Sequence, residues 1–238
     1  MYLLTANPIL IVSAIIPAIF LMVKVYKADK IEKEPGRLLV SLILLGIIST
    51  SIAMILETIG TFALDSFLNE NSLIYAAIMY FGVVAVSEEG AKYVLLKKKT
   101  WKSANFNFRF DGIVYAVFVS LGFALWENVG YVTAYGFTTA VVRAITAVPG
   151  HACFGVFMGY WYGLAKAFEN SGNALASKRA RKLSLIVPVL MHGTYDFIAT
   201  LDSYLFSLIF IAFVVSMFGI ALRMVKRTSR IDYHINPY

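Results

Sequence analysis

The chain has 238 residues, of which 59% are hydrophobic and 15% charged, with a formal net charge of +7 and a mean hydropathy of +0.73. A soluble domain of this length must cover its surface with polar groups, so the composition excludes one and indicates a polytopic membrane protein. The single cysteine, Cys153, excludes an internal disulfide framework.

Several segments are apolar and long enough to cross a bilayer, which takes about 20 residues. They are residues 8–25, 38–64, 73–96, 112–134, 140–165, 183–201 and 203–224. The connections between them are too short to hold a soluble domain. The sequence therefore predicts an all-α transmembrane bundle of about seven spans, forming a single integral membrane domain over residues 1–238.

Basic residues alternate between the connections. All Lys and Arg except Lys92 and Arg143 lie at or after the ends of the first, third, fifth and seventh segments, and the other loops carry none. By the positive-inside rule this places the N-terminus outside and the C-terminus in the cytoplasm. These clusters also face anionic headgroups, so membrane lipid is an expected partner and nucleic acid is not.

The third segment contains the stretch SEEGAK, with Glu88, Glu89 and Lys92 inside an apolar run. An ionisable group near the centre of a spanning helix costs about 2.5–3.5 kcal/mol on insertion scales. Such groups persist when they pair, face the bundle interior or take part in chemistry. Because Glu88 and Lys92 are four residues apart, we expect Lys92 to pair with Glu88 and Glu89 to point elsewhere.

The fourth and fifth segments each add polar groups. In FALWEN, Phe123 and Glu127 share a helix face, and Asn128 follows. In the fifth segment His151 precedes a glycine at every fourth position, through residue 163. Small residues at that spacing let another helix approach closely, so we expect this helix at the packed centre of the bundle. The dipeptide Pro149-Gly150 is expected to interrupt the same span.

The sixth segment carries His192 and Asp196, four residues apart, so that the carboxylate lies beside the imidazole. At 1.5 Å per residue, Glu88 and His192 lie roughly 12 and 14 Å above the basic ends of their helices. Glu127 and His151 lie roughly 20 Å up. These depths predict one shared polar layer built from the third to sixth segments.

Two histidines and several carboxylates in a dry layer suit the hydrolysis of a carbonyl compound by either of two routes. Catalytic zinc takes three such ligands and keeps one position for water, whose pKa falls toward about 7. Alternatively, a glutamate activates water directly and His192 with its neighbours stabilises the oxyanion. The sequence contains neither HExxH nor GxSxG, which excludes ordinary zincins and serine hydrolases.

These motifs resemble those of the PrsW-type intramembrane proteases, distant relatives of the Abi and CAAX-processing proteases. The stretch from Glu88 to Lys92 matches EExxK, that from Phe123 to Glu127 matches FxxxE, and His151 and His192 follow on later helices. The lysine is one position closer than the arginine of the Abi pattern EExxxR, and Glu127 replaces a histidine. Both departures argue against a role on prenylated proteins.

The resemblance implies a bacterial cytoplasmic membrane and site-1 cleavage of a single-span substrate such as an anti-sigma factor. It also implies that Glu88 and Glu89 hold or activate water and that His151 and His192 complete the site. We expect Glu89 as the general base. The remaining assignments are Glu127, His151 and His192 as the zinc or oxyanion cluster, with Lys92, Phe123, Asn128 and Asp196 in support.

Two other functions remain compatible with the same residues. A proton- or cation-coupled transporter would use the intramembrane Glu and His groups as a relay. Such a protein is typically built from inverted repeats, and the chain shows no clear repeat. A non-catalytic scaffold would pair all the polar groups with one another and leave no position for water or a metal.

Overall fold

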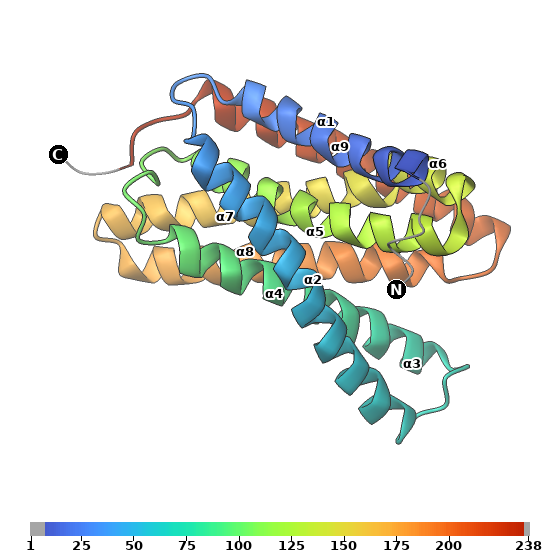
Figure 1. Cartoon of the computed structure of the whole chain (residues 1–238). Coiled ribbons are helices and arrows are strands. Elements are labelled where there is room, and N and C mark those ends of the chain that lie inside the picture. Colours follow the sequence, from blue (N-terminus) through green and yellow to red (C-terminus); the bar gives the residue numbers. More distant parts are fainter. Residues whose placement is uncertain (1–7, 236–238) are drawn as a thin grey trace.

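The computed structural model describes residues 8–235, and Figure 1 shows a bundle of long helices. In chain order the elements are α1 (Pro8–Ala28), α2 (Gly36–Asp65), α3 (Leu73–Ala77), the π-helical η2 (Ile78–Val84), α4 (Ala85–Thr100), α5 (Asp111–Tyr135), α6 (Phe137–Ile145), α7 (Ala147–Asn170), α8 (Ala174–Ala199) and α9 (Tyr204–Arg230). No strand is assigned within these residues beyond one isolated bridge. The predicted all-α class is therefore confirmed.

Six helical segments are long and apolar enough to cross a membrane. They are α1, α2, α5, α9 and the two composite segments Leu73–Thr100 and Phe137–Asn170. The predicted span 183–201 corresponds to α8, which begins earlier, at Ala174. Helix α8 is not counted among these six segments because its first turns are basic and its apolar part carries His192 and Asp196. It is the seventh long helix of the bundle.

The helices α5 and α7 share the centre of the bundle, so the expectation that the glycine-rich helix lies there is confirmed. No residue of α7 is exposed, and in α5 83% of the apolar window is buried, compared with 17% for α9. The buried α5 is less apolar than the lipid-facing α9.

The glycine-rich helix α7 packs directly against α5. A Cβ atom at Gly155 would lie 2.9 Å from the Cα atom of Val117, and Gly159 and Gly163 meet the backbone of α5 and of the loop before it in the same way. The hydroxyl of Ser120 donates a hydrogen bond to the carbonyl of His151 at 2.7 Å. The close backbone approach therefore sets the position of His151 relative to α5.

The expected interruption at Pro149-Gly150 does not occur. The helix instead breaks at Thr146, between α6 and α7, where φ is −119° and ψ is −79°. Pro149 lies in the first turn of α7, where its missing N–H would have no partner within the helix.

The outer half of α2 and helix α3 project away from the bundle (Figure 1). Met54, Ile55 and Leu56 are consecutive, yet 60%, 61% and 45% exposed. Because successive residues of an α-helix point about 100° apart, exposure of all three means that this part of α2 lacks a packed neighbour on most sides. The outer half of α2 therefore presents an exposed apolar surface.

At the opposite end, the linker between α1 and α2 is bonded to the start of α5. The Tyr115 hydroxyl donates to Glu34 at 2.8 Å, and the side-chain amide of Asn107 donates to Glu32 at 2.9 Å. The C-terminal segment joins the same region, where Asp232 accepts from the N–H of Phe110 at 2.9 Å. We call this the basic end, since the predicted Lys and Arg clusters lie here.

Two carboxyl groups of this linker are buried. Burial raises the pKa of Glu34 from 4.5 to about 7 and that of Asp29 from 3.8 to about 6. One oxygen of each carboxyl group has no hydrogen-bond partner within the described residues. A raised folded-state pKa stabilises the fold at low pH, and that stabilisation is lost as the pH rises through the folded-state value.

We expect Glu34→Gln to unfold at a higher temperature than the wild type at pH 8 and at a similar temperature at pH 5. Glutamine keeps the acceptor for Tyr115 but carries no buried charge above pH 7. Thermal unfolding in detergent at both pH values measures the difference, with exposed Glu32→Gln as the control. Parallel curves for Glu34→Gln and the wild type at both pH values would contradict it.

Candidate active site

The helices α4, α5, α7 and α8 bring every side chain expected at the site into one connected network. The members are Glu88, Glu89, Lys92, Phe123, Glu127, Asn128, His151, His192 and Asp196. Glu89, Lys92 and Asn128 are fully buried. The predicted polar layer is thus a continuous set of contacts across four helices.

The ammonium group of Lys92 lies at the middle of this network. It donates to Glu88 at 3.0 Å and to Glu89 at 2.8 Å, and it lies 3.3 Å from Nδ1 of His151. It also lies 3.8 Å from the centroid of the Phe123 ring. The expectation that Lys92 pairs with Glu88 alone is therefore wrong, because a lysine reaches both the i−3 and the i−4 positions of its own helix.

Each histidine has a carboxylate behind it. Nε2 of His151 lies 3.0 Å from Glu127, and Nε2 of His192 lies 3.2 Å from Asp196. The Nδ1 atoms face the other way, with that of His192 lying 3.1 Å from Glu89. A carboxylate behind an imidazole fixes its tautomer and orientation, so both rings present Nδ1 to the Glu88–Glu89 pair.

A second set of contacts holds Glu127. The Arg143 guanidinium donates to Glu127 at 2.6 Å and to Asn128 at 2.9 Å. Asn128 in turn donates to the carbonyl of Ala14 in α1 at 2.7 Å. Arg143 comes from α6, so the break at Thr146 turns a separate short helix toward the site.

Two aromatic residues at the site were missed by the sequence reasoning. Phe154 stacks on the ring of His192 with centroids 4.7 Å apart, and its only sequence signal is its place three residues after His151. Phe81 of η2 touches Gly193, where an added Cβ would lie 2.5 Å from the ring. Only glycine permits that approach, which brings the neighbouring His192 close to α4.

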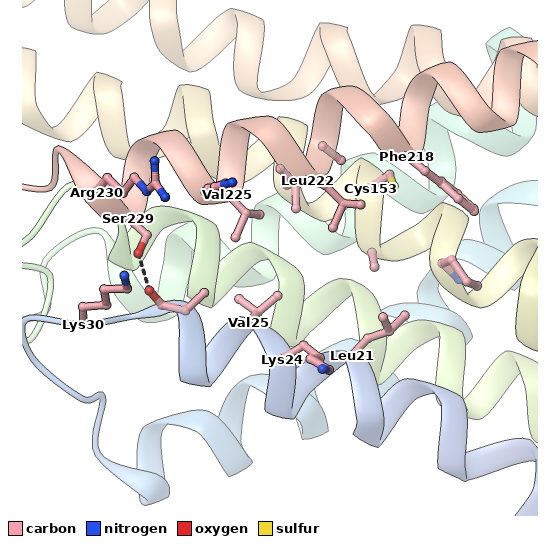
Figure 2. Close-up of a pocket in the computed structure, with 16 residues that line it drawn as sticks. Leu21, Lys24, Val25, Lys30, Cys153, Phe218, Leu222, Val225, Ser229 and Arg230 are labelled. Atoms are coloured by element: carbon pink, nitrogen blue, oxygen red, sulfur yellow. Dashed lines mark hydrogen bonds between the residues drawn. The ribbon is translucent and has the colours of Figure 1, made fainter.

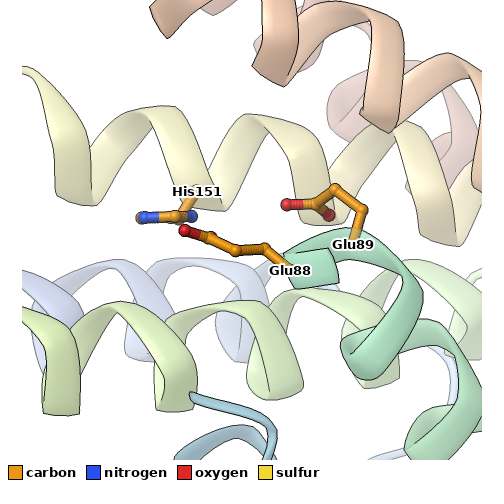
Figure 3. Close-up of side chains that lie close together, drawn as sticks. All are labelled: Glu88, Glu89 and His151. Atoms are coloured by element: carbon orange, nitrogen blue, oxygen red, sulfur yellow. The ribbon is translucent and has the colours of Figure 1, made fainter. Parts of the chain in front are cut away.

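Among the described residues, one group of Asp, Glu, Cys and His side chains could hold a metal ion. It consists of Glu88, Glu89 and His151, whose ligand atoms all lie within 4.8 Å of one another (Figure 3). This differs from the expected set, because Glu127 contacts the far nitrogen of His151. Carboxylate oxygen and imidazole nitrogen are zinc ligands, so the donor set fits a metal of that kind.

The Lys92 ammonium lies within 3.3 Å of an atom of each of these three residues. A metal ion and this ammonium would therefore compete for one place. The second oxygen of Glu89 is buried and has no partner among the described residues. This open acceptor is the feature that a fully paired scaffold would lack.

Known proteins of similar sequence belong to one family. A model of a family described as PrsW family intramembrane metalloprotease matches residues 34–222. Protease PrsW of Halalkalibacterium halodurans is 34% identical over 94% of this chain and 98% of its own length. The proteins of the same name from Oceanobacillus iheyensis and Bacillus subtilis are 35% and 30% identical, over 91% and 94% of this chain and 94% and 97% of their own lengths. No solved structure matches.

We expect Lys92→Met to unfold at a lower temperature than the wild type, because it leaves two buried carboxylates without their cation. Breaking a buried ion pair in this way costs about 3–5 kcal/mol. Adding Glu89→Gln to Lys92→Met should recover part of the loss by removing one of the charges.

Thermal unfolding of the purified protein in detergent tests this. The matched control is Lys98→Met, an exposed lysine of the same helix. If Lys92→Met unfolds at the wild-type temperature, the ammonium is not the counter-charge of the pair.

Proposed function

The chain belongs to the PrsW family of intramembrane metalloproteases, and from that membership we propose that it hydrolyses a peptide bond of a single-span membrane protein at the buried site around Glu88, Glu89, His151 and His192. As a member of this family it is a protease and a multi-pass protein of a bacterial membrane. Family membership also decides against the transport and scaffold alternatives. The proposal for the site rests above all on the unpartnered oxygen of buried Glu89.

Glu89 is our general base. Its Oε1 atom is held by Lys92 and His192, while Oε2 has no partner among the described residues and is free to accept a proton from water. The water oxygen then bonds to the peptide carbon, and the same carboxyl group passes the proton to the leaving nitrogen as the C–N bond breaks. Lys92 also bonds one oxygen of Glu88, so the choice of Glu89 rests on the full burial of its unpartnered oxygen.

In the route without a metal, the negative charge that develops on the carbonyl oxygen needs donors in a dry site. Lys92 brings an ammonium group, and its contacts with Glu88 and Glu89 fix its position before the substrate arrives. The imidazole of His192, held from behind by Asp196, is the second donor when its Nδ1–H turns from Glu89 to the substrate. Prearranged donors in a water-excluded site are worth far more than the same donors in water.

The metal of the family would be held by Glu88 and His151 together with Nδ1 of His192, which leaves Glu89 as the base. Zinc suits these donors, and when bound it would lower the pKa of a ligand water and polarise the substrate carbonyl. Glu127 and Asp196 would then act behind the two histidines and set their orientation. Binding there requires that the ammonium of Lys92 leave its place between the glutamates.

The exposed apolar surface on the outer half of α2 supports lateral entry of the substrate. The outer half of α2 exposes apolar side chains on most of its circumference, and Phe62 is 76% exposed. A spanning helix of the substrate can pack there. The neighbouring η2 leads directly into α4, which carries Glu88 and Glu89. A single-span anti-sigma factor, the substrate implied by the resemblance, would reach the site in this way.

We expect Glu89→Gln to lower the rate of cleavage by about 10²–10⁴-fold, because an amide cannot accept the proton. Asp196→Asn should cost about 10–100-fold, since it disturbs only the orientation of His192. Each variant is reconstituted with a single-span anti-sigma factor in lipid vesicles, and the assay follows cleavage of that substrate. Exposed Glu70→Gln is the matched control. Full cleavage by both Glu89→Gln and His192→Ala would falsify the site.

Metal analysis of protein purified without chelators tests the proposed ligands. We expect about one zinc per chain in the wild type, the stoichiometry of a mononuclear catalytic site, and its loss in His151→Ala/His192→Ala. Glu88→Gln should lose the metal, whereas Glu127→Gln should bind it only about 10–100-fold more weakly. If Glu127→Gln lost the metal and Glu88→Gln kept it, Glu127 would be a ligand in place of Glu88. A metal-free wild type would leave water activation to Glu89 alone.

A further inference from the structure

A long groove lies on the side of α7 that faces away from the site (Figure 2). Its volume is about 680 Å³, and it is bounded by α1, α7 and α9. Positions 149, 152, 153 and 156 of α7 form its floor. Since an α-helix has 3.6 residues per turn, these positions share one face and His151 lies on the opposite one. The groove is thus separate from the active site.

The length of the groove matches one leaflet of a bilayer. On α9 it is lined from Phe218 to Arg230, which corresponds to roughly 18 Å at 1.5 Å per residue. One leaflet contributes about half of a hydrocarbon core that is about 30 Å thick. Apart from its basic end, the groove is lined mainly by aliphatic side chains such as Val25, Val156 and Leu222. It therefore has the length and polarity of an acyl-chain site.

The basic end of the groove is cationic. Lys30, Lys226 and Arg230 line it, and within residues 8–235 no acidic residue does. None of these three side chains forms an ion pair within the described residues. A hydrogen bond from Ser229 to the carbonyl of Ala28 closes this end between Lys30 and Arg230, as Figure 2 shows. The charges therefore surround the level at which a lipid phosphate would lie.

We propose that this groove binds an anionic phospholipid of the leaflet at the basic end, with an acyl chain between α1 and α9 and the headgroup among Lys30, Lys226 and Arg230. Basic pockets between spanning helices on the cytoplasmic side suit such headgroups. A spanning helix of another protein fits less well, because it needs the full thickness of the bilayer and is about 10–12 Å wide. The inference does not depend on the proposed catalytic mechanism.

The lipid would complete the packing of two sparsely buried helices. Only 22% of the apolar window of α1 and 17% of that of α9 is buried within the chain. A chain of methylene groups between them would fill the space behind α7, the helix that carries His151. The bound lipid is therefore expected to act as a structural ligand of the bundle.

Native mass spectrometry of the protein in detergent tests the proposal, with phosphatidylglycerol as the anionic probe and phosphatidylcholine as the zwitterionic one. We expect one retained phosphatidylglycerol per chain and weaker retention of phosphatidylcholine. Neutralising Lys30, Lys226 and Arg230 together to Gln should lower the preference by at least about tenfold, since each cation near the surface contributes about fivefold.

The matched control is Lys27→Gln/Arg223→Gln/Arg227→Gln. It removes the same charge from exposed positions of α1 and α9 and leaves the groove intact. A second variant, Ala221→Phe, fills the apolar part and keeps every cation, so both lipids should be lost.

Three results would overturn the proposal. Equal retention of the two lipids by the wild type would remove the role of the charge. An equal loss of the preference for phosphatidylglycerol in the control variant would show that the effect comes from net charge and not from the groove. A bound mass equal to a second copy of the chain would assign the groove to dimerisation.

Discussion

The site depends on one buried cation. Two adjacent carboxylates in a dry helix interior repel each other, and the ammonium of Lys92 is the group that lets Glu88 and Glu89 share one turn of α4. The same ammonium contacts His151 and the ring of Phe123, so it links α4 to α7 and α5. In a medium of low dielectric constant these attractions are strong, and an unmatched charge is correspondingly costly. The positions of the three helices are therefore interdependent.

Small residues and an irregular turn place the remaining groups around that cation. Gly155 lets α7 approach α5, and Gly193 lets α8 approach η2, each next to or one turn from a site histidine. The π-helical η2 immediately precedes α4, and such segments are frequent at functional sites because they change the register of the helical turns after them. The orientation of the two glutamates thus depends on backbone features that carry no charge.

Much of this arrangement could be predicted from local spacing. The pairs Glu88–Lys92 and His192–Asp196 follow from the i, i+4 geometry of a helix, and the shared depth of the polar residues follows from the rise per residue. The nitrogen that each histidine presents could not be predicted, and so Glu127 was expected among the metal ligands. The central place of α5 was missed because only the glycine spacing of α7 was used to place a helix at the centre. The early start of α8 reflects Asn173, which caps the helix by accepting from the N–H of Ala176.

The bonds between the C-terminal segment and the loop before α5 bear on the order of assembly. The N–H of Phe110 reaches Asp232, and the N–H of Ile235 reaches the carbonyl of Asn107, so residues made more than 120 positions apart meet at the basic end. Domains form progressively as a chain is synthesised. The four helices of the site are complete at Ala199, before α9 exists, whereas these terminal bonds form last. The residues that fasten the two ends of the chain at the basic end are therefore made after all four helices of the site.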